Sequence, residues 1–372
     1  MTIGILKETQ KGETRVAISP NIAKQLIGHG FKIIVEEGAG FISSFKDSRY
    51  KKIGATIEKR GVVFKDSEVL VKINPFDTDD LKLVRKDQIL ISQLFHKSHP
   101  ELIKEIATTG VTAFSLDAIP RISRAQDMDV LSSQNNLAGY KAVIRGAFEM
   151  TKIFPLMMTA AGTISPARVL IYGVGVAGLQ AIATAKRLGA IVEATDIRPE
   201  TKEQTESLGA KFIQVDSNGE QSNGVYANAA SEDYLRRQKE AVNNSLFKAD
   251  LVITTAMVPG RKSPILITKE QVEQMQNGAI IIDLAADQGG NCALSEMNKI
   301  VVKNGVKIIG TTLSPESVST NASELFGKNM YNFIMHLTNK TQFEFNLEEE
   351  ITDETLIVHH GRIRKNGKTN IV

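Results

Sequence analysis

The sequence has only one cysteine, Cys292, so it cannot form an internal disulfide framework and suits a reducing compartment. It also lacks an excess of either charge, because it has 45 Lys and Arg residues and 42 Asp and Glu residues, which gives a net charge of +3. This balance is too even to indicate a surface for nucleic acid or for anionic membrane lipid. We therefore expect no nucleic-acid partner and no lipid-binding face.

Long apolar segments are missing as well. The least charged stretch, 153–185, is interrupted by Arg168, prolines and glycines, whereas a membrane-spanning helix needs about 20 predominantly apolar residues. The N-terminal residues lack the apolar core of a signal peptide. The sequence has no metal-ligand cluster, no nucleophilic triad and no phosphate loop with an adjacent lysine. At 372 residues, it is expected to be a soluble, intracellular protein of two domains, without direct membrane insertion.

What the sequence has instead is a regular alternation of strand-like and helical segments. Ser19 and Pro20 predict a helix start, and Thr268 with Gln271 predicts a capping box. Strands are predicted at 2–7, 32–36, 69–73, 89–93, 111–116, 168–172, 191–196, 211–215, 251–255, 279–283 and 306–310, and shorter helices at 101–107, 176–188 and 200–208. This alternation predicts an α/β protein with two Rossmann-like, doubly wound domains.

The predicted domain limits follow from two helical segments, 132–154 and 323–338, which bracket the middle of the chain. Because the chain after Gly310 is too short for a domain of its own, we expect it to return to the first domain. Two linker helices then join a discontinuous domain, 1–130 with 318–372, to a second domain at 131–317. The polar segment 216–240 is predicted to be a mobile binding loop, with a tolerated surface insertion as the alternative.

A glycine-rich turn follows the strand at 168–172 and precedes a helix. In this turn, Gly173 allows a tight bend, Gly175 lets a pyrophosphate approach the backbone, and Gly178 lets the helix pack close to the strand. The pyrophosphate is expected at the helix N-terminus, beside Val176 and Ala177, where the helix dipole favours negative charge. The motif therefore predicts a dinucleotide site.

Asp196 ends the next strand, where a carboxylate accepts hydrogen bonds from a ribose 2′-hydroxyl and repels a 2′-phosphate. This position favours NAD(H), although Arg198 offers an alternative partner for the phosphate of NADP(H). The loops 254–260 and 283–290 follow later strands, so they are expected to line the same crevice. Met257 in the first loop is predicted to pack on a flat ring, with core filling as the alternative.

The segment RISRAQDMDVLSSQ at 121–134 is the most specific part of the sequence. Together with GVGVAG at 173–178, TTAMVPGR at 254–261 and DLAADQGGNC at 283–292, it closely resembles the NAD(H)-binding component of proton-translocating NAD(P)+ transhydrogenases. The resemblance covers nearly the whole chain, and much of it is shared with the related alanine dehydrogenases.

The resemblance implies that hydride passes directly from NADH on this chain to NADP+ on a separate NADP(H)-binding component. It also implies a membrane-spanning component that couples the transfer to proton translocation. The chain is then a homodimer, held peripherally at the cytoplasmic face of the bacterial inner membrane by its partner subunits.

Site residues carried over from the resemblance fall into two groups. Those that orient the nicotinamide are Arg121, Gln126, Asp129 and Ser132. Those that bind the cofactor are Asp127, Met128, Gly173, Gly175, Val176, Ala177, Gly178, Asp196, Ile197, Arg198, Val225, Tyr226, Gln238, Thr255, Ala256 and Met257. Gln126 suits direct hydride transfer because its amide hydrogen-bonds without offering a proton. A structural ion pair between Arg121 and Asp129 is the alternative for those two residues.

Alanine dehydrogenase is the main alternative function. Its substrate site needs an arginine and a lysine for a carboxylate and a histidine for proton transfer. Arg15 and Lys72 stand at matching places, and Asp287 also resembles the dehydrogenase. The histidine fits less well, because Phe95, rather than His96, occupies the position where the dehydrogenase motif has its histidine. A non-catalytic NAD(H)-sensing module is a third hypothesis, which no specific feature supports.

Overall fold

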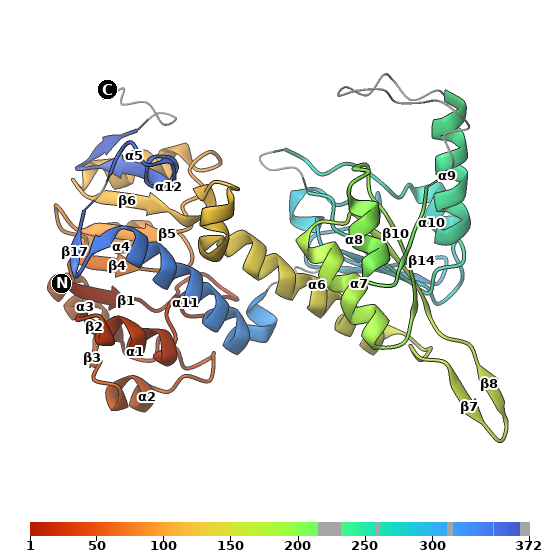
Figure 1. Cartoon of the computed structure of the whole chain (residues 1–372), viewed down its shortest axis with the longest axis horizontal. Coiled ribbons are helices and arrows are strands. Elements are labelled where there is room, and N and C mark those ends of the chain that lie inside the picture. The colour runs from red at the N-terminus through yellow and green to blue at the C-terminus, as the bar shows by residue number, and fades with distance from the viewer. Residues whose placement is uncertain (215–231, 258–260, 311–314, 345, 365–372) are drawn as a thin grey trace. The chain divides into compact units, whose positions relative to one another are not determined.

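The computed structural model describes residues 1–214, 232–257, 261–310, 315–344 and 346–364 (Figure 1). The chain divides into unit 1, Met1–Gln134 with Pro315–Val372, and unit 2, Asn135–Ser314. The sequence-based limits, 1–130 with 318–372 and 131–317, differ from these by only a few residues. No helix in the described parts of the chain is both long and apolar enough to cross a membrane.

Unit 1 is built on an eight-stranded sheet in the order β19-β18-β6-β5-β4-β1-β2-β3. Its strands are β1 (Thr2–Ile5), β2 (Lys32–Glu36), β3 (Thr56–Glu58), β4 (Val69–Val71), β5 (Ile89–Ser92), β6 (Thr112–Ser115), β18 (Leu356–His359) and β19 (Arg362–Ile363). The first six strands pair in parallel, whereas β18 runs antiparallel to both β6 and β19. The C-terminal segment thus extends the sheet begun by the N-terminus, which is the arrangement expected of a discontinuous first domain.

The helices of unit 1 include the predicted start at Ser19, whose Oγ accepts a hydrogen bond from the Ile22 amide (3.4 Å). The helical elements are α1 (Pro20–Gly28), α2 (Asp47–Lys52), α3 (Arg60–Asp66), α4 (Thr78–Leu83), α5 (Pro100–Thr108), η1 (Leu116–Ala118), η2 (Ser123–Met128), η4 (Pro315–Val318), α11 (Ser319–His336) and α12 (Glu350–Thr355). A small ribbon, β16 (Thr338–Asn339) with β17 (Gln342–Phe343), follows α11. Buried side chains of α11, among them Phe326, Met330 and Phe333, belong to the main core of the unit.

Unit 2 carries a seven-stranded sheet in the order β11-β10-β9-β12-β13-β15-β14. Its strands are β9 (Arg168–Tyr172), β10 (Ile191–Thr195), β11 (Lys211–Phe212), β12 (Leu251–Thr254), β13 (Ile280–Asp283), β14 (Ile300–Lys303) and β15 (Val306–Ile309). Leaving out the antiparallel edge strand β14, the order of the parallel strands is that of a complete doubly wound dinucleotide-binding fold. The predicted fold class is therefore confirmed.

The helices of unit 2 include those that the sequence predicted after β9 and β10. They are α6 (Val130–Glu149), which begins in unit 1, α7 (Val176–Arg187), α8 (Thr201–Ser207), α9 (Glu232–Leu246), α10 (Lys269–Glu273) and η3 (Ala286–Gln288). The capping box of Thr268 and Gln271 is present at the start of α10. An unpredicted hairpin, β7 (Met157–Thr159) with β8 (Gly162–Ile164), projects from the body of the unit (Figure 1).

The prediction of a loop at 216–240 is wrong for its last nine residues, because α9 begins at Glu232. Residues 232–240 are rich in Glu, Leu, Arg, Gln and Lys, which favour a helix by intrinsic propensity. The prediction relied on apolar periodicity, which these residues barely show. The rest of the predicted loop, 216–231, lies outside the described residues.

Candidate functional site

The glycine-rich turn after β9 forms an open cradle at the start of α7. Gly173 has a φ of +91°, a left-handed conformation that glycine adopts without strain. A Cβ built on Gly178 would lie 1.9 Å from the carbonyl oxygen of Gly173, so only glycine allows this close packing. A Cβ on Gly175 would meet no atom within 4 Å. The backbone at Gly175 therefore leaves room for a phosphate group, which the amides that open α7 are suited to bind.

Asp196 lies directly beyond β10, beside this turn. Its Oδ2 accepts a hydrogen bond from the Val174 amide (2.7 Å), and its two oxygens accept bonds from Nε and Nη2 of Arg198 (3.0 and 2.9 Å). Burial alone would raise the pKa of Asp196, but the bonds from the Arg198 side chain and the two backbone amides hold that pKa below its ordinary value. The carboxylate thus stays ionised at neutral pH, ready to accept a hydrogen bond from a ribose hydroxyl.

The side chains around Asp196 also suit a nucleotide. Arg198 is directed at Asp196, and this ion pair leaves its guanidinium less available to a 2′-phosphate. Ile197 is 97% exposed and Val176 is 38% exposed, so both offer apolar surface to a flat base. The cradle, the ionised carboxylate and these apolar side chains together fit a dinucleotide.

The loop after β12 is bound to the glycine turn by Thr255, whose amide donates to the carbonyl of Tyr172 (2.9 Å). The Oγ1 of Thr255 also donates to the carbonyl of Gly173 (2.9 Å). Next in the loop, Ala256 exchanges hydrogen bonds with the side chain of Asn291, at 3.0 Å for its amide and 2.8 Å for its carbonyl. Met257 is half-buried, and its Sδ accepts a weak hydrogen bond from Gln288 (3.7 Å).

Two residues that the sequence analysis did not single out, Asp283 and Asn291, organise these loops. Asp283 ends β13 and is 1% exposed, and it accepts bonds from Thr254 Oγ1 (3.0 Å) and the Asn291 amide (2.8 Å). Asn291 is fully buried and reaches across to Ala256. The sequence does carry one signal for Asp283, since this carboxylate directly follows a run of isoleucines that predicts a buried strand. A charge buried at the end of such a strand needs several hydrogen-bond partners.

The segment RISRAQDMDVLSSQ at 121–134 forms η2 and the start of α6. Asp129 accepts hydrogen bonds from the Ser132 amide at Oδ1 (2.9 Å) and from Ser132 Oγ at Oδ2 (2.6 Å), so these two predicted residues lie together. Arg121 and Gln126 are exposed, and neither side chain bonds to a described residue. The alternative ion pair between Arg121 and Asp129 is absent from the described structure.

The remaining residues predicted to bind the cofactor differ in how exposed they are and in which element they belong to. Asp127 is exposed, whereas Met128 is 7% exposed and lies in the core of unit 1, so its side chain faces the interior. Gln238 lies on α9, and its Nε2 donates to the carbonyl of Ile213 (2.9 Å). Val225 and Tyr226 lie outside the described residues.

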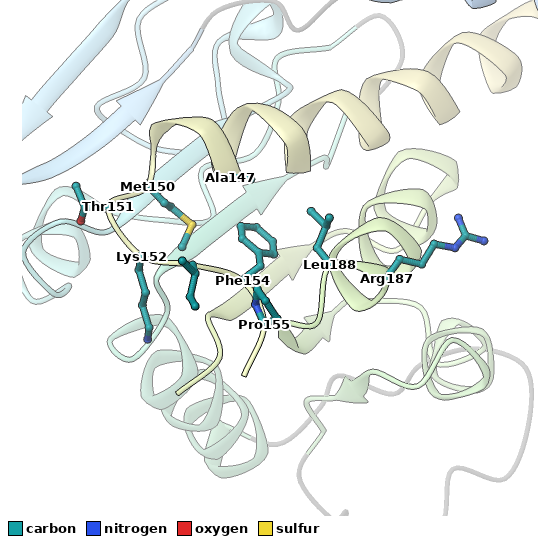
Figure 2. Close-up of a pocket in the computed structure, with 9 residues that line it drawn as sticks. Ala147, Met150, Thr151, Lys152, Phe154, Pro155, Arg187 and Leu188 are labelled. Atoms are coloured by element: carbon teal, nitrogen blue, oxygen red, sulfur yellow. The ribbon is translucent and has the colours of Figure 1, made fainter. Parts of the chain in front are cut away.

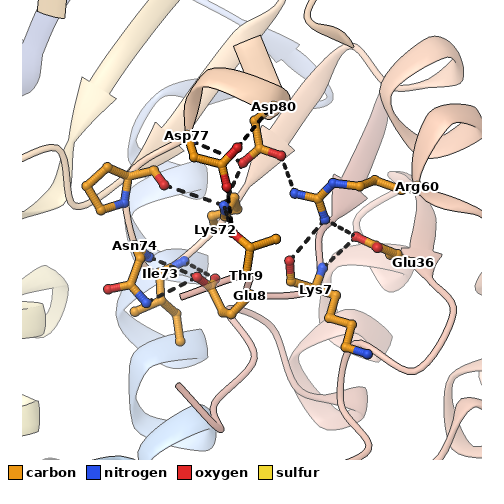
Figure 3. A network of polar contacts seen from close by, with 11 residues as sticks. Lys7, Glu8, Thr9, Glu36, Arg60, Lys72, Ile73, Asn74, Asp77 and Asp80 are labelled. Carbon is orange, nitrogen blue, oxygen red and sulfur yellow. Dashed lines mark hydrogen bonds and ion pairs between the residues drawn. The ribbon is translucent and has the colours of Figure 1, made fainter. Parts of the chain in front are cut away.

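The two cations that a dehydrogenase would use for a carboxylate substrate already have partners within unit 1. Lys72 is fully buried and its Nζ lies 2.6 Å from Asp80, which also pairs with Arg60 (Figure 3). Arg15 is paired with Glu13 at 2.6 Å, and both residues are buried. Both cations are thus neutralised by carboxylates of their own unit.

Two other titratable groups of unit 1 have shifted pKa values. Burial raises the pKa of Glu8 to about 6, although Lys72 and the amides of Ile73 and Asn74 act against it. Burial lowers the pKa of His96, and its buried Nδ1 has no hydrogen-bond partner among the described residues.

Comparison with known proteins gives two family models and several similar chains. The model "Alanine dehydrogenase/PNT, N-terminal domain" matches residues 4–138, and "Alanine dehydrogenase/PNT, C-terminal domain" matches residues 142–366. The first part of NAD(P) transhydrogenase subunit alpha of Rhodospirillum rubrum is 48% identical over 98% of this chain and 97% of its own length.

The alanine dehydrogenase of Bacillus subtilis is 30% identical over 78% of this chain and 72% of its own. The crystal structure of transhydrogenase from Sinorhizobium meliloti has 39% identity and a TM-score of 0.90, covering 98% of this chain and 100% of that one. The family models and the extent of these similarities lead to one assignment: the chain belongs to the alanine dehydrogenase/PNT family.

Proposed function

We propose that this chain is the NAD(H)-binding subunit of a proton-translocating NAD(P)+ transhydrogenase. The chain binds NADH, and hydride passes from the nicotinamide to NADP+ held by a separate NADP(H)-binding component. A membrane-spanning component couples this transfer to proton movement. The observation that carries the proposal is Gln126, a neutral and exposed amide on η2, in a unit whose buried cations are neutralised by its own carboxylates.

This arrangement suits hydride transfer better than alanine oxidation. Transfer between two nicotinamides needs orientation and exclusion of water, but no acid or base from the protein. Alanine oxidation needs a proton acceptor and a cation for the substrate carboxylate. Lys72 and Arg15 are occupied, whereas Asp129 and Ser132 form a rigid cap beside the exposed Gln126. The relatives named transhydrogenase subunit alpha, up to 48% identical, support the same choice.

The two functions are separated by one pair of assays on the purified chain. Hydride transfer from NADH to an NADP+ analogue is expected once the NADP(H)-binding component is added, and alanine-dependent NAD+ reduction is expected to be at background. Robust alanine oxidation without the partner component would overturn the proposal.

Gln126→Asn is expected to bind NADH with nearly unchanged affinity but to slow hydride transfer about tenfold or more. The shorter side chain withdraws the amide by one methylene, and small displacements cost much in oriented transfer. Stopped-flow absorbance measures the transfer and NADH fluorescence measures the binding. Gln25→Asn, on the exposed surface of α1, is the matched control. Unchanged transfer in Gln126→Asn would remove Gln126 from the site.

The nucleotide specificity belongs to the same proposal. Asp196 is ionised and Arg198 is turned toward it, which favours NAD(H) on this chain and leaves NADP(H) to the partner.

The chain is also proposed to form a homodimer, supported by apolar surface on unit 2. The β7–β8 hairpin exposes Met158 (77%) and Ile164 (44%), and Leu156 just before it is 56% exposed. Near the base of the hairpin, the end of α6 and the end of α7 border a hollow with apolar side chains such as Met150, Phe154 and Leu188 (Figure 2). A two-fold pairing would let the hairpin of each copy cover the hollow of the other.

Met158→Asp is expected to weaken the dimer at least about 100-fold, because a charge in an apolar contact is left without a partner. Sedimentation or light scattering would show monomers at concentrations where the unchanged chain is dimeric. Leu83→Asp adds the same charge at a 41% exposed position of unit 1 and should remain dimeric. A dimer of unchanged affinity in Met158→Asp would exclude the hairpin from the interface.

The partners and location follow from the proposed function. The chain works with the NADP(H)-binding and membrane-spanning components of the same enzyme. These components hold it peripherally at the cytoplasmic face of the bacterial inner membrane.

A further inference from the structure

Two asparagines of the long helix α11 form hydrogen bonds to the backbone of η2, the turn that carries Gln126. Nδ2 of Asn329 donates to the carbonyl oxygen of Asp127 at 2.7 Å, and Nδ2 of Asn332 donates to the same oxygen at 3.0 Å. Residues three apart lie on one side of a helix, so α11 presents both amides together. A carbonyl oxygen has two lone pairs, and here both are used.

The turn η2 depends on such outside support. It is a six-residue 3-10 helix whose N-cap makes no side-chain hydrogen bond, and 3-10 helices of this length are intrinsically weak. Its inward residues, Ala125 and Met128, are buried in the same core as Phe326 and Met330 of α11. The outward residue Gln126 is therefore placed by a backbone that α11 holds from the inside.

A second contact holds the same turn, but less firmly. Arg124 pairs with Glu349 at 2.7 Å, and Glu349 also bonds to His336 at 2.9 Å. The Arg124 side chain is 57% exposed, and exposed ion pairs contribute little because water screens them. Among the polar contacts of η2, the hydrogen bonds to the Asp127 carbonyl are thus the stronger restraint.

Asn329 is not the residue that stability alone would favour. It is 7% exposed, and its Oδ1 is buried without a hydrogen-bond partner among the described residues. A buried, unsatisfied acceptor destabilises the folded state. What the residue supplies is the donor that meets the Asp127 carbonyl.

We propose that Asn329 and Asn332 are positioning residues for hydride transfer. They fix the Asp127 carbonyl, one residue after Gln126, and thereby hold the Gln126 amide in the orientation that transfer needs. This inference rests on the proposed function. Because transfer between two rings tolerates only small displacements, loosening η2 slows the reaction without removing the bound nucleotide.

The test uses Asn332→Asp, because Asn332 is less buried than Asn329 and its loss disturbs the fold less. The aspartate keeps the shape of asparagine but removes the donor and sets a charge against the carbonyl. With the NADP(H)-binding component present, single-turnover hydride transfer is expected to fall roughly tenfold or more. The dissociation constant for NADH is expected to stay within about twofold, and the melting temperature close to that of the unchanged chain.

Asn332→Asp is compared with a control variant and with a conservative variant. Asn321→Asp makes the same change in the first turn of α11, at an exposed position away from η2, and should transfer hydride normally. Asn332→Gln keeps a donor and should recover most of the rate. If Asn332→Asp proves unstable, Asn332→Ser is measured in its place, and hydrogen exchange at the amides of 123–128 reports on η2 directly.

A double-mutant cycle with Gln126→Asn decides whether the asparagines act through Gln126. If they do, Asn332→Asp slows transfer less in the Gln126→Asn background than in the unchanged chain. Provided that the unchanged chain transfers hydride, two results would overturn the inference. One is that the rate losses of the two substitutions are fully additive, and the other is normal transfer in Asn332→Asp. Absence of transfer in the unchanged chain would instead overturn the proposed function, and the inference with it.

Discussion

Replacing Gly175 by alanine is expected to weaken NADH binding about 10- to 100-fold while the free energy of unfolding stays the same. The added methyl meets no protein atom within 4 Å, and the backbone of Gly175 is in a region open to alanine. The methyl instead occupies the space proposed for the pyrophosphate. Loss of one or two charge-assisted hydrogen bonds to backbone amides accounts for the expected factor.

Gly178→Ala is expected to lower both stability and binding, unlike Gly175→Ala, which lowers binding alone. Its methyl would lie 1.9 Å from the carbonyl oxygen of Gly173, so α7 must move away from the turn and the melting temperature falls together with NADH affinity. Gly61→Ala, where the methyl also meets nothing, is the control for a harmless glycine replacement. Calorimetric titration and thermal unfolding measure both quantities. Normal NADH affinity in Gly175→Ala would show that the nucleotide does not bind at this turn.

Replacing Asp80 by alanine is expected to lower the free energy of unfolding by about 3–5 kcal/mol. The Lys72 ammonium is fully buried beside Asp80, so the variant leaves an unpaired charge in the interior. Asp80 also pairs with Arg60 and completes the capping box of α4 with Asp77 (Figure 3). The expected loss is large because one carboxylate serves all three contacts.

Lys72→Met is expected to cost clearly less than Asp80→Ala, since Asp80 keeps Arg60 as a partner and methionine fills much of the same volume. Asp79→Ala is the matched control, because the neighbouring carboxylate is 88% exposed and its loss should cost less than about 1 kcal/mol. Urea unfolding with a common slope supplies all three values. Equal costs for Asp80→Ala and Asp79→Ala would mean that the buried pair does not stabilise unit 1.

The elements that the sequence predicted well carry their signals within a few residues. Ser19 caps α1, Thr268 and Gln271 form the capping box of α10, and the predicted strands of unit 2 recur in the Rossmann order. The unpredicted elements have little signal of their own. The strands β3, β18 and β19 are two to four residues long and exist because a neighbouring strand offers them hydrogen bonds.

The candidate site divides in the same way. The glycine turn and Asp196 are recognisable because the turn needs glycine at set positions and the carboxylate follows the next strand at a set distance. Asn291 with Ala256, and Asn329 with Asp127, are contacts between residues 35 and 202 positions apart in the chain, so no local pattern predicts them.

The sequence by itself determined the fold class, the glycine turn and the resemblance that named a family, because periodicity, turn chemistry and motif spacing are local properties. Tertiary structure alone decided which charges remain available. Arg15 and Lys72 match a dehydrogenase site in the sequence, but folding brings Glu13 and Asp80 to within 2.6 Å of them. A buried cation must be paired to be stable. Glu13 is a near neighbour of Arg15 in the chain, but only the folding of unit 1 buries that pair and brings Asp80 of α4 to Lys72.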